Sequence, residues 1–319
     1  SVDDSAGCHP LPVSFTNQST LRDSCVWTYG DGNGRNDCSP NFTHTYNNST
    51  SFFPVDYPAQ LIIITDNGCR DTARKNIRVN PQIIAAFDSD TAGCHPFPVR
   101  FNDQSTGAAF YEWRFGDGGA SPQQNPQHFF LSNVLRDTIF TTQLKVRSNF
   151  GCVDSISQDI TVYPKPIADY SIDENDGCHP LPVSFLSNSS LADSCVWKFG
   201  DGVDLIDCGP SVNHTYNNTL SLVPINYTSR LEVYTNRGCA DTLSRSIQVR
   251  PQVTADFDVD TIGCSPLDLT YRSQSFGAVS FQWDFGNGRI AMGQIVTNQY
   301  TNTGSVDSIY TTQLIAQSL

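Results

Sequence analysis

Methionine occurs only once in the 319 residues, and 19 lysines and arginines stand against 32 aspartates and glutamates. The formal charge of −13 argues against a nucleic-acid partner, because phosphate binding requires clusters of basic side chains. No apolar run approaches the ~18 residues of a membrane span, and we expect any secretion signal to lie upstream of this segment. No Gly-x-Ser-x-Gly, His-Glu-x-x-His or P-loop motif occurs, so the sequence predicts no enzyme and no catalytic residue.

None of the 11 cysteines lies in a Cys-x-x-Cys pair, the spacing that usually signals a zinc site. Cysteines without such pairs indicate disulfides, and disulfides indicate an oxidising, extracellular compartment. No stretch of 12 residues shows a helical period, and charged residues make up only 16% of the chain. Threonine, serine and asparagine are plentiful. This composition is typical of exposed β-sandwiches and predicts an all-β fold.

One motif occurs four times: an aromatic pair followed by a turn flanked by glycines. A Gly-Cys precedes each copy, and these Gly-Cys pairs are 84 to 86 residues apart. That length is too great for a solenoid unit and suits a small independent β-domain. The copies are VWTYGDG from Val26, EWRFGDG from Glu112, VWKFGDG from Val196 and QWDFGNG from Gln282, with the cysteines at Cys8, Cys94, Cys178 and Cys264.

The four repeats alternate between two types. A shift of 170 residues lays CHPLPVSF at Cys8 over the same letters at Cys178, and TTQL at Thr141 over TTQL at Thr311. The order is therefore A-B-A-B, and we expect the chain to be a segment of a longer array. Proline-marked junctions divide it into repeats A1, B1, A2 and B2, which span residues 1–80 (first strand truncated), 81–163, 164–250 and 251–319 (C-terminally truncated).

Within repeat A1 the sequence predicts strands at residues 11–15, 25–29, 59–65 and 73–79. These are short runs rich in β-branched and aromatic residues, separated by Gly, Asn, Asp and Pro. A further stretch, Ser51 to Tyr57, lies between predicted strands in A-type repeats. It contains the apolar run Phe52 to Val55, which has a counterpart at Leu222 to Ile225 in A2.

The order of these motifs resembles the PKD (polycystic kidney disease) domain. The shared features are Trp-x-Phe-Gly-Asp-Gly between two strands, a downstream His-Thr-Tyr, a long strand ending in Asn-Gly-Cys and a closing strand. The resemblance implies four tandem immunoglobulin-like β-sandwiches. Repeat B2 departs from it, with Asn287 in place of the turn aspartate. The cysteine-bearing version is similar to the repeat arrays of gliding-associated surface adhesins of Bacteroidota-type bacteria.

Several repeated side chains are predicted to be structural. The tryptophans, Trp27, Trp113, Trp197 and Trp283, should plug the core between two sheets. The six histidines occupy two repeat positions, His9, His95 and His179 and then His44, His128 and His214, which B2 fills with Ser265 and Gln299. An exchange of that kind does not fit catalysis or metal binding. We expect no metal and no cofactor; calcium held by the acidic residues before each Gly-Cys is the weaker alternative.

The resemblance also points to surface modification. Aspartate followed by Ser or Thr and a small or branched apolar residue looks like the O-glycosylation acceptor of the bacteria resembled. The candidate acceptors are Ser5, Thr72, Thr91, Thr138, Ser155, Thr242, Thr261 and Ser308. The alternative is that Gly-Cys-x-Asp-Thr is simply how a final strand begins.

Cys25 and Cys38 flank the first glycine turn almost symmetrically, which places them opposite each other on a hairpin and within disulfide reach. Cys195 and Cys208 repeat this arrangement in A2. B-type repeats lack both cysteines.

The Gly-Cys cysteines allow two wirings. In an immunoglobulin-like sandwich Cys8 and Cys69 lie at opposite ends, too far apart for a disulfide. In a head-to-tail array, the corner of one domain, which carries its Gly-Cys cysteine, faces the last turn of the next domain. This arrangement favours the inter-domain pairs Cys8–Cys152 and Cys94–Cys239. The alternative pairs the cysteines within repeats, as Cys8–Cys69, Cys94–Cys152 and Cys178–Cys239.

Repetition favours a structural role, because one-off chemistry does not need four copies of a scaffold. We expect a rigid stalk in a large extracellular cell-surface adhesin or filament. The resemblance alone implies links to gliding motility and to export by the type IX secretion system. Its partners would be neighbouring repeats, surface glycans or other cell-surface proteins. The alternatives are a PKD spacer in a secreted hydrolase and a glycan-binding module. The bound ligand, the parent protein's length, the host and the assembly state cannot be predicted.

Overall fold

The computed structural model describes residues 1–20 and 23–318. Across these ranges every regular element is a strand, and no helix occurs. The chain divides into two compact units, Ser1–Pro164 and Lys165–Leu319. Each unit contains two immunoglobulin-like β-sandwiches, an A-type followed by a B-type.

In A1 a five-stranded sheet in the order β1-β7-β6-β3-β4 covers a two-stranded sheet, β2-β5. Residues Leu11, Val13 and Phe15 alternate with more exposed neighbours along β2, so one face of that strand enters the core. The strands are β1 (Ala6–Cys8), β2 (Leu11–Thr16), β3 (Ser24–Thr28), β4 (Gly34–Arg35), β5 (Asn41–Tyr46), β6 (Val55–Ile64) and β7 (Arg70–Asn80).

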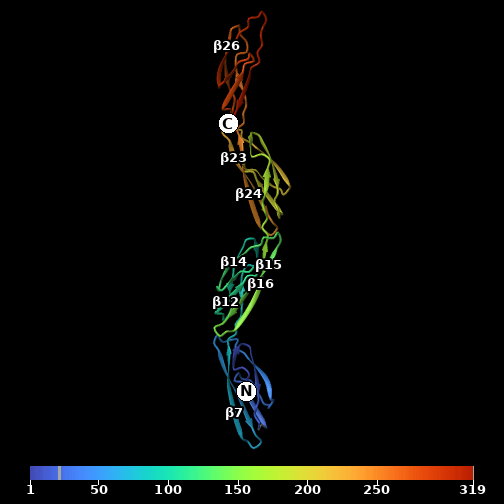
Figure 1. Cartoon of the computed structure of the whole chain (residues 1–319), viewed down its shortest axis with the longest axis vertical. Coiled ribbons are helices and arrows are strands. Elements are labelled where there is room, and N and C mark those ends of the chain that lie inside the picture. The colour runs from blue at the N-terminus through green and yellow to red at the C-terminus, as the bar shows by residue number, and fades with distance from the viewer. Residues whose placement is uncertain (21–22, 319) are drawn as a thin grey trace. The chain divides into compact units, whose positions relative to one another are not determined.

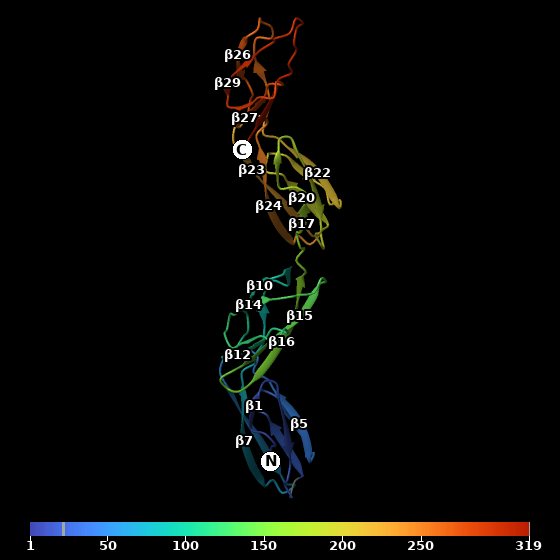
Figure 2. The same cartoon turned by 45° about the horizontal axis from the view of Figure 1, so that its top comes forward.

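B1 has the same plan, with sheets β13-β12-β15-β16-β9, β10-β14 and β11-β8. Its longest strands, β15 and β16, pair over ten positions and lie side by side in Figure 1 and in Figure 2. The strands are β8 (Phe87–Asp88), β9 (Ala92–Cys94), β10 (Phe97–Arg100), β11 (Asn102–Asp103), β12 (Phe110–Arg114), β13 (Ala120–Ser121), β14 (Gln127–Phe130), β15 (Thr138–Arg147) and β16 (Val153–Tyr163).

The second unit repeats both types. A2 has sheets β18-β24-β23-β20-β21 and β17-β19-β22, and B2 has β28-β27-β30 and β25-β26-β29. The strands of A2 are β17 (Tyr170–Ile172), β18 (Asp176–Cys178), β19 (Leu181–Ser187), β20 (Ser194–Lys198), β21 (Asp204–Ile206), β22 (Ser211–Tyr216), β23 (Ile225–Tyr234) and β24 (Ala240–Arg250). Those of B2 are β25 (Phe257–Asp258), β26 (Leu267–Ser273), β27 (Ser280–Asp284), β28 (Ile290–Met292), β29 (Ile295–Tyr300) and β30 (Gln313–Gln317).

The long hairpin of A1 is longer than the sequence predicted. Strand β6 begins at Val55 rather than residue 59, and Val55 pairs with Val79 near the end of β7. Part of the stretch from Ser51 to Tyr57 is therefore strand. Polar residues and Pro58 hid this extension, because the β-rich signal begins only at Ala59.

A short strand, β1, was not predicted. Its three residues pair in parallel with the end of β7, and Cys8 lies opposite Asn80. Ala, Gly and Cys carry little strand signal, so only the tertiary pairing reveals it. The same parallel pairing joins β9 to β16 and β18 to β24. Each places a Gly-Cys cysteine at the end of a long strand.

The buried hydrophobic residues form four clusters, one in each predicted repeat. A tryptophan lies in every cluster, with an aromatic ring packed against it edge to face, as between Phe15 and Trp27 at 5.5 Å. The indole N–H groups of Trp113, Trp197 and Trp283 each donate to a backbone carbonyl ten residues later. In these three repeats the tryptophan thus ties the core to the far side of its own hairpin, whereas the indole nitrogen of Trp27 is buried without a hydrogen-bond partner.

Replacement of Trp113 by alanine should lower the free energy of unfolding of B1 by about 3–5 kcal/mol, because it leaves a large cavity and an unpaired carbonyl. Hydrogen exchange of the B1 core amides measures this loss. The matched control is Ile139→Ala, on the same repeat but 63% exposed, which should change stability by less than about 1 kcal/mol. Equal effects of the two variants would contradict the role of tryptophan as core plug.

Candidate functional site: the disulfide-linked repeat junction

The Gly-Cys corner of A1 is held by its histidine. His9 precedes a cis peptide bond to Pro10, and its Nδ1 accepts a hydrogen bond from the backbone N–H of Asn48 at 3.0 Å. The Asn48 amide, itself buried, donates to the carbonyl of Val79 at the end of β7. His95 and His179 make the same bond in B1 and A2, and in B2 the Ser265 hydroxyl accepts it instead. These histidines therefore organise the corner.

The same asparagine reaches the junction with the next repeat. The carbonyl of Asn48 accepts a hydrogen bond from the backbone N–H of Gln82 at 2.9 Å, just after Pro81, which is buried. The corner, the end of β7 and the first residues of B1 are thus tied together by backbone groups.

The other half of the junction is a tight turn in B1. Gly151 adopts a φ of +84°, a conformation that a β-carbon would disfavour. The turn is closed by the Ser148 N–H, which donates to the Cys152 carbonyl at 2.8 Å, and by the Ser148 hydroxyl, which accepts from the Cys152 N–H. Only 3% of Cys152 is exposed.

Cys8 and Cys152 form a disulfide across this junction. Their Cα atoms are 5.6 Å apart although the residues are separated by 144 positions in the sequence. The bond joins the corner of A1 to the turn of B1. It therefore links two sandwiches that the chain itself connects only through the segment after β7.

Each A-type repeat also carries a disulfide on its glycine hairpin. Cys25 bonds to Cys38, and Cys195 bonds to Cys208, with Cα distances of 5.1 Å in both pairs. The first cysteine of each pair is buried in its core cluster. These bonds therefore hold the glycine hairpin against the core cluster that contains the tryptophan.

The intradomain wiring is wrong. Cys8 bonds to Cys152, while Cys69 and Cys178 are free and exposed, as is Cys264. The pairs Cys8–Cys69, Cys94–Cys152 and Cys178–Cys239 are thereby excluded. The physical reason is the length of the long strands: Cys69 precedes β7, whereas Cys8 lies beside its last residue.

The turn aspartates pair with the second set of histidines, which the sequence reasoning missed. Asp31 Oδ1 accepts the N–H of Asn33, and its Oδ2 lies 2.7 Å from Nε2 of His44. The His44 ring stacks on Tyr29 at 4.0 Å. The pairs Asp117–His128 and Asp201–His214 repeat the arrangement at 2.6 Å. B2 replaces both members of this pair. Asn287 takes the place of the aspartate, and Asn298 takes that of the histidine, because Asn298 lies opposite Leu269 as His128 lies opposite Val99. The sequence prediction placed the histidine position one residue too late, at Gln299. The joint replacement was the signal that could have revealed the pairing.

These contacts shift the titration of the aspartates. Burial alone would raise the pKa of Asp31, but hydrogen bonds from His44 and from Asn33 outweigh it and lower that pKa below its usual value. The pKa of Asp117 is lowered in the same way by His128 and the Gly119 N–H, against the effect of burial. The turn carboxylates are therefore engaged as caps and histidine partners.

Nothing in the described ranges groups three or more His, Cys, Asp or Glu side chains as a metal site would. Of the acidic residues before each Gly-Cys, Asp3 accepts N–H groups of Asp4 and Ser14, and Asp173 accepts that of Ser184. These carboxylates bridge two segments of their sandwich. The expectation that they hold no metal stays a prediction, with calcium as the weaker alternative.

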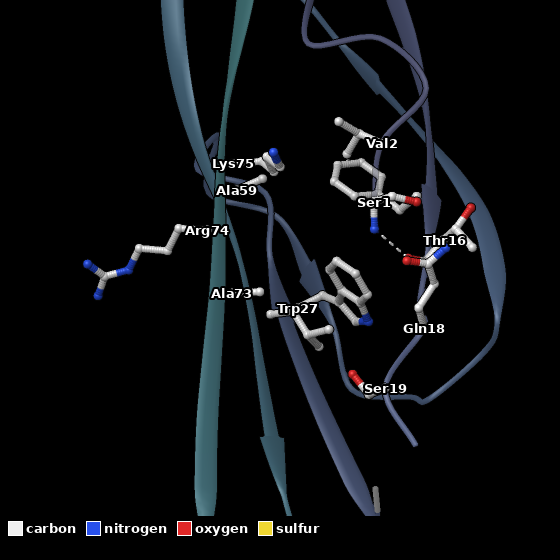
Figure 3. A pocket seen from close by; sticks show the side chains of 12 residues that line it. Ser1, Val2, Thr16, Gln18, Ser19, Trp27, Ala59, Ala73, Arg74 and Lys75 are labelled. Carbon is white, nitrogen blue, oxygen red and sulfur yellow. Dashed lines mark hydrogen bonds between the residues drawn. The ribbon is translucent and has the colours of Figure 1, made fainter. Parts of the chain in front are cut away.

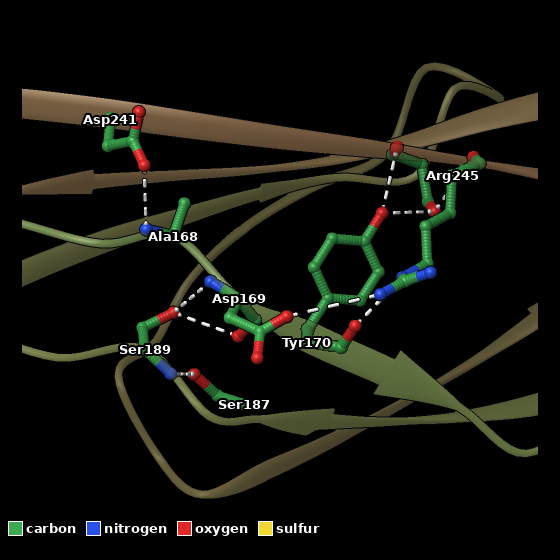
Figure 4. Close-up of polar contacts among 8 residues, drawn as sticks. Ala168, Asp169, Tyr170, Ser187, Ser189, Asp241 and Arg245 are labelled. Atoms are coloured by element: carbon green, nitrogen blue, oxygen red, sulfur yellow. Dashed lines mark hydrogen bonds and ion pairs between the residues drawn. The ribbon is translucent and has the colours of Figure 1, made fainter.

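The proposed glycosylation acceptors lie at the surface. Seven are exposed, namely Ser5, Thr72, Thr91, Ser155, Thr242, Thr261 and Ser308, and Thr138 is half-buried. The aspartates before two of them have a structural task. Asp154 accepts the N–H of Ala85 at 2.7 Å, and Asp241 accepts that of Ala168 at 3.0 Å (Figure 4). Those aspartates therefore hold the first segment of their own sandwich, a role that the sequence did not suggest.

The apolar loops of the A-type repeats are open to solvent. Phe52 is 74% and Phe53 75% exposed, and the counterparts Leu222 and Val223 are each 59% exposed. In the part of the chain that the structure describes, no helix has the length and apolar character needed to cross a bilayer.

Comparison with known proteins identifies one domain. The family model described as PKD domain matches residues 78–162, which corresponds to B1. A PKD domain is thus present in the chain, and membership of the other three repeats stays a prediction. No curated protein matches the chain.

Several solved structures are similar over one or more repeats. The PKD1 domain of Vibrio anguillarum Epp is 23% identical, with 28% of this chain and 96% of that chain covered and a TM-score of 0.22. The PKD1 domain of the Vibrio cholerae metalloprotease PrtV is 22% identical, with 27% and 96% covered and a TM-score of 0.22. A Ca2+-stabilized adhesin of an Antarctic bacterium is 9% identical, with 96% and 93% covered and a TM-score of 0.28. With such TM-scores none of these similarities supports a functional assignment.

Acid should weaken B1 through its turn aspartate. Because the folded-state pKa of Asp117 lies below the unfolded value of about 3.9, the carboxylate stabilises B1 above that pH. This contribution is lost as the pH falls from about 4 through the folded-state pKa. The double variant Asp117→Asn with His128→Asn, which copies the residues of B2, should be less stable than the parent at pH 7, by about 1–2 kcal/mol. The difference should shrink below pH 4.

Hydrogen exchange of B1 amides at several pH values measures this effect. B2, which carries Asn287 and Asn298 at these positions naturally, serves as an internal control and should respond equally in both proteins. A difference that stays constant from pH 7 to pH 2 would rule out the aspartate as its source.

Proposed function

We propose that this chain is a load-bearing, non-enzymatic stalk segment of a large extracellular adhesin or filament at a cell surface. The observation that carries the proposal is the Cys8–Cys152 disulfide, which joins two successive sandwiches covalently. Spacers that only separate two active modules need no such bond. A segment that transmits force does, because tension otherwise unravels whichever repeat is weakest.

The disulfide changes the path that tension follows. Pulled from its ends, the chain carries load from Cys8 directly to Cys152, and the 144 positions between them are bypassed. At ~3.3–3.6 Å per extended residue, about 500 Å of chain is withheld from stretching. Nearly all of A1 and B1 lies within this closed loop.

The same bond stabilises the fold. By loop-closure entropy, a loop of this size contributes about 5 kcal/mol, whereas the 13-residue separation of Cys25 and Cys38 contributes about 3 kcal/mol. The junction bond therefore supports both sandwiches more strongly than the hairpin bond supports one. Both bonds require an oxidising, extracellular setting to persist.

A second junction bond, Cys94–Cys239, belongs to the proposal. Cys94 ends β9 beside Tyr163, as Cys8 ends β1 beside Asn80. Cys239 closes its turn by accepting a hydrogen bond from the N–H of Thr235, as Cys152 does from that of Ser148. Equivalent local structure at both cysteines is what supports this pairing.

The finer parts of the proposal rest on the sequence resemblance. They are a link to gliding motility, export by the type IX system, glycosylation of the aspartate-linked Ser and Thr residues, and association with neighbouring repeats of the same longer chain. The exposure of the acceptor side chains is compatible with modification.

Glycan binding is the second candidate, because Phe52 and Phe53 present exposed rings on one loop. Exposed aromatic rings are the usual stacking surface for sugars. In A2 the corresponding loop carries the aliphatic residues Leu222 and Val223 in place of the two aromatic residues. Because only one loop presents aromatic rings in this way, glycan binding ranks behind the stalk function.

Single-molecule stretching of the intact chain tests the stalk function. Under oxidising conditions the fully stretched chain should be at least about 500 Å shorter than under reducing conditions. A variant with Cys8, Cys94, Cys152 and Cys239 all replaced by serine should stretch without reductant to within about 90 Å of full length, because the two hairpin disulfides still withhold 13 residues each. The matched control, Cys25→Ser with Cys38→Ser, removes a disulfide inside the closed loop and should leave the oxidised length unchanged. A difference of only about 90 Å between the oxidised and the reduced chain, which the two hairpin disulfides alone produce, would refute the load path.

Peptide mapping of the non-reduced chain tests the second junction bond. Peptides that contain Cys94 should be recovered joined to those that contain Cys239. Cys69, Cys178 and Cys264 should react with an alkylating reagent before any reduction, which provides a control for disulfide exchange. Recovery of Cys94 joined to any of these three would show the proposed pairing to be wrong.

A further inference from the structure

We propose that the outer face of β7 in A1 binds an anionic polysaccharide. Three exposed arginines, Arg70, Arg74 and Arg78, follow one another at every fourth position of this strand. Because successive side chains of a strand point to opposite faces, all three lie on the face opposite to Ile77, which is buried in the core of A1. Figure 3 shows Arg74 pointing away from Trp27. We call these three residues the arginine row.

The positive charge of the arginine row is not compensated by neighbouring side chains. Asp56 lies opposite Arg78 on the paired strand β6, yet among the described residues none of the three guanidinium groups forms an ion pair. The chain as a whole has the opposite sign, with a formal charge of −13. A basic row on an otherwise acidic chain is therefore a local surface that complements an anion.

Basic side chains on the same face of other repeats are neutralised within their own sandwich. In A2, Lys198 and Arg230 both pair with Glu232. In B1, Arg114 pairs with Glu112. These carboxylates occupy the hydrogen-bonding groups that an external anion would bind, whereas the arginine row keeps its guanidinium groups available.

The arginine row is not required by the fold. Its three positions are occupied by uncharged residues in two other repeats, namely Ala240, Ser244 and Gln248 in A2 and Val153, Ser157 and Thr161 in B1. A preceding repeat also does not cover this face. Val153, which like Arg70 directly follows the Gly-Cys turn, is 55% exposed although A1 precedes it.

The spacing of the row fits an extended polymer. At ~3.3 Å per residue, neighbouring arginines are about 13 Å apart and the row spans about 26 Å, so a small anion would contact only one of them. Thr72 and Asn76 lie between the arginines on the same face and offer hydrogen-bonding groups to hydroxyls. Charged groups separated by hydroxyl-bearing ones are the pattern of a polysaccharide that contains acidic sugars.

Other polyanions fit this face less well. Strands β3, β6 and β7, all within the described residues, place no aromatic side chain on it, and single-stranded nucleic acids bind by stacking their bases on such rings. A stable protein interface needs an apolar centre, whereas Ile62 and Ile64 on this face are half-buried. A polysaccharide needs neither feature. The inference does not depend on the stalk function or on the aromatic loop at Phe52.

Binding of the intact oxidised chain to dextran sulfate and to polygalacturonate, measured by isothermal titration calorimetry, tests the proposal and distinguishes sulfated from carboxylated sugars. The chain is used without attached glycans, because Thr72 is a candidate glycosylation acceptor within the row. Saturable binding to at least one of the two polymers is expected, and it should weaken as the salt concentration rises. Neutral dextran should not bind.

Protein variants locate the site. The triple variant Arg70→Ala, Arg74→Ser and Arg78→Gln copies A2, so it should fold, and it should weaken binding about tenfold or more because three charge contacts are lost. The matched control removes the same charge from exposed positions of B1, through Arg100→Ser, Arg136→Ser and Lys145→Ser, and should leave binding nearly unchanged.

Three outcomes would overturn the proposal. Absence of saturable binding to both polymers would remove the ligand. An equal loss of binding in the two triple variants would show that net charge, and not the arginine row, determines binding. Competition by poly-glutamate as strong as that by the polysaccharide at equal charge would show that the row does not select sugars.

Discussion

The eleven-residue length of β7 is the constraint on which the rest of the architecture depends. At ~3.3 Å per residue it separates the corner at one end of a sandwich from the turn at the other by about 36 Å. A disulfide tolerates a Cα separation of only about 7 Å, so a corner cysteine has no partner within its own repeat. The disulfide from the corner cysteine therefore reaches the neighbouring sandwich. The length of the strand thus determines that the bond forms between repeats and not within one.

Part of this structure was predictable from sequence because the features concerned are local or repeated. Trp27 and its three counterparts lie in the cores, as their spacing beside glycine turns indicated. The thirteen-residue separation of Cys25 and Cys38 around such a turn predicts a hairpin bond, which is the bond observed. In both cases a few neighbouring residues determine the geometry, so no knowledge of distant partners is needed.

Other features depend on contacts between distant segments, and the sequence carried little signal for them. Strand β1 exists only because it pairs with β7 some seventy positions away. Val55 belongs to a strand only because Val79 lies opposite. The pairing of Asp31 with His44 crosses between two sheets. The sequence signal for this pairing was that B2 replaces both residues. That signal is visible only when the two positions are compared together.

The turn pairs also show how the repeats differ in chemistry while they keep one shape. Three repeats use a carboxylate and an imidazole, and B2 has two uncharged amides, Asn287 and Asn298, at these positions. The Asn287 side chain still caps the Arg289 N–H at 3.1 Å. The cap is therefore the shared requirement, and the histidine partner is an addition.

The closed loop between Cys8 and Cys152 also alters what a protease can achieve. A cut at an exposed site within it, such as the Ser49–Thr50 bond, leaves both new ends attached through the disulfide and through the strands around them. Two cuts are needed before any piece of these sandwiches can be lost. A protein that works outside the cell among hydrolases would thereby remain in one piece after damage that severs an ordinary chain.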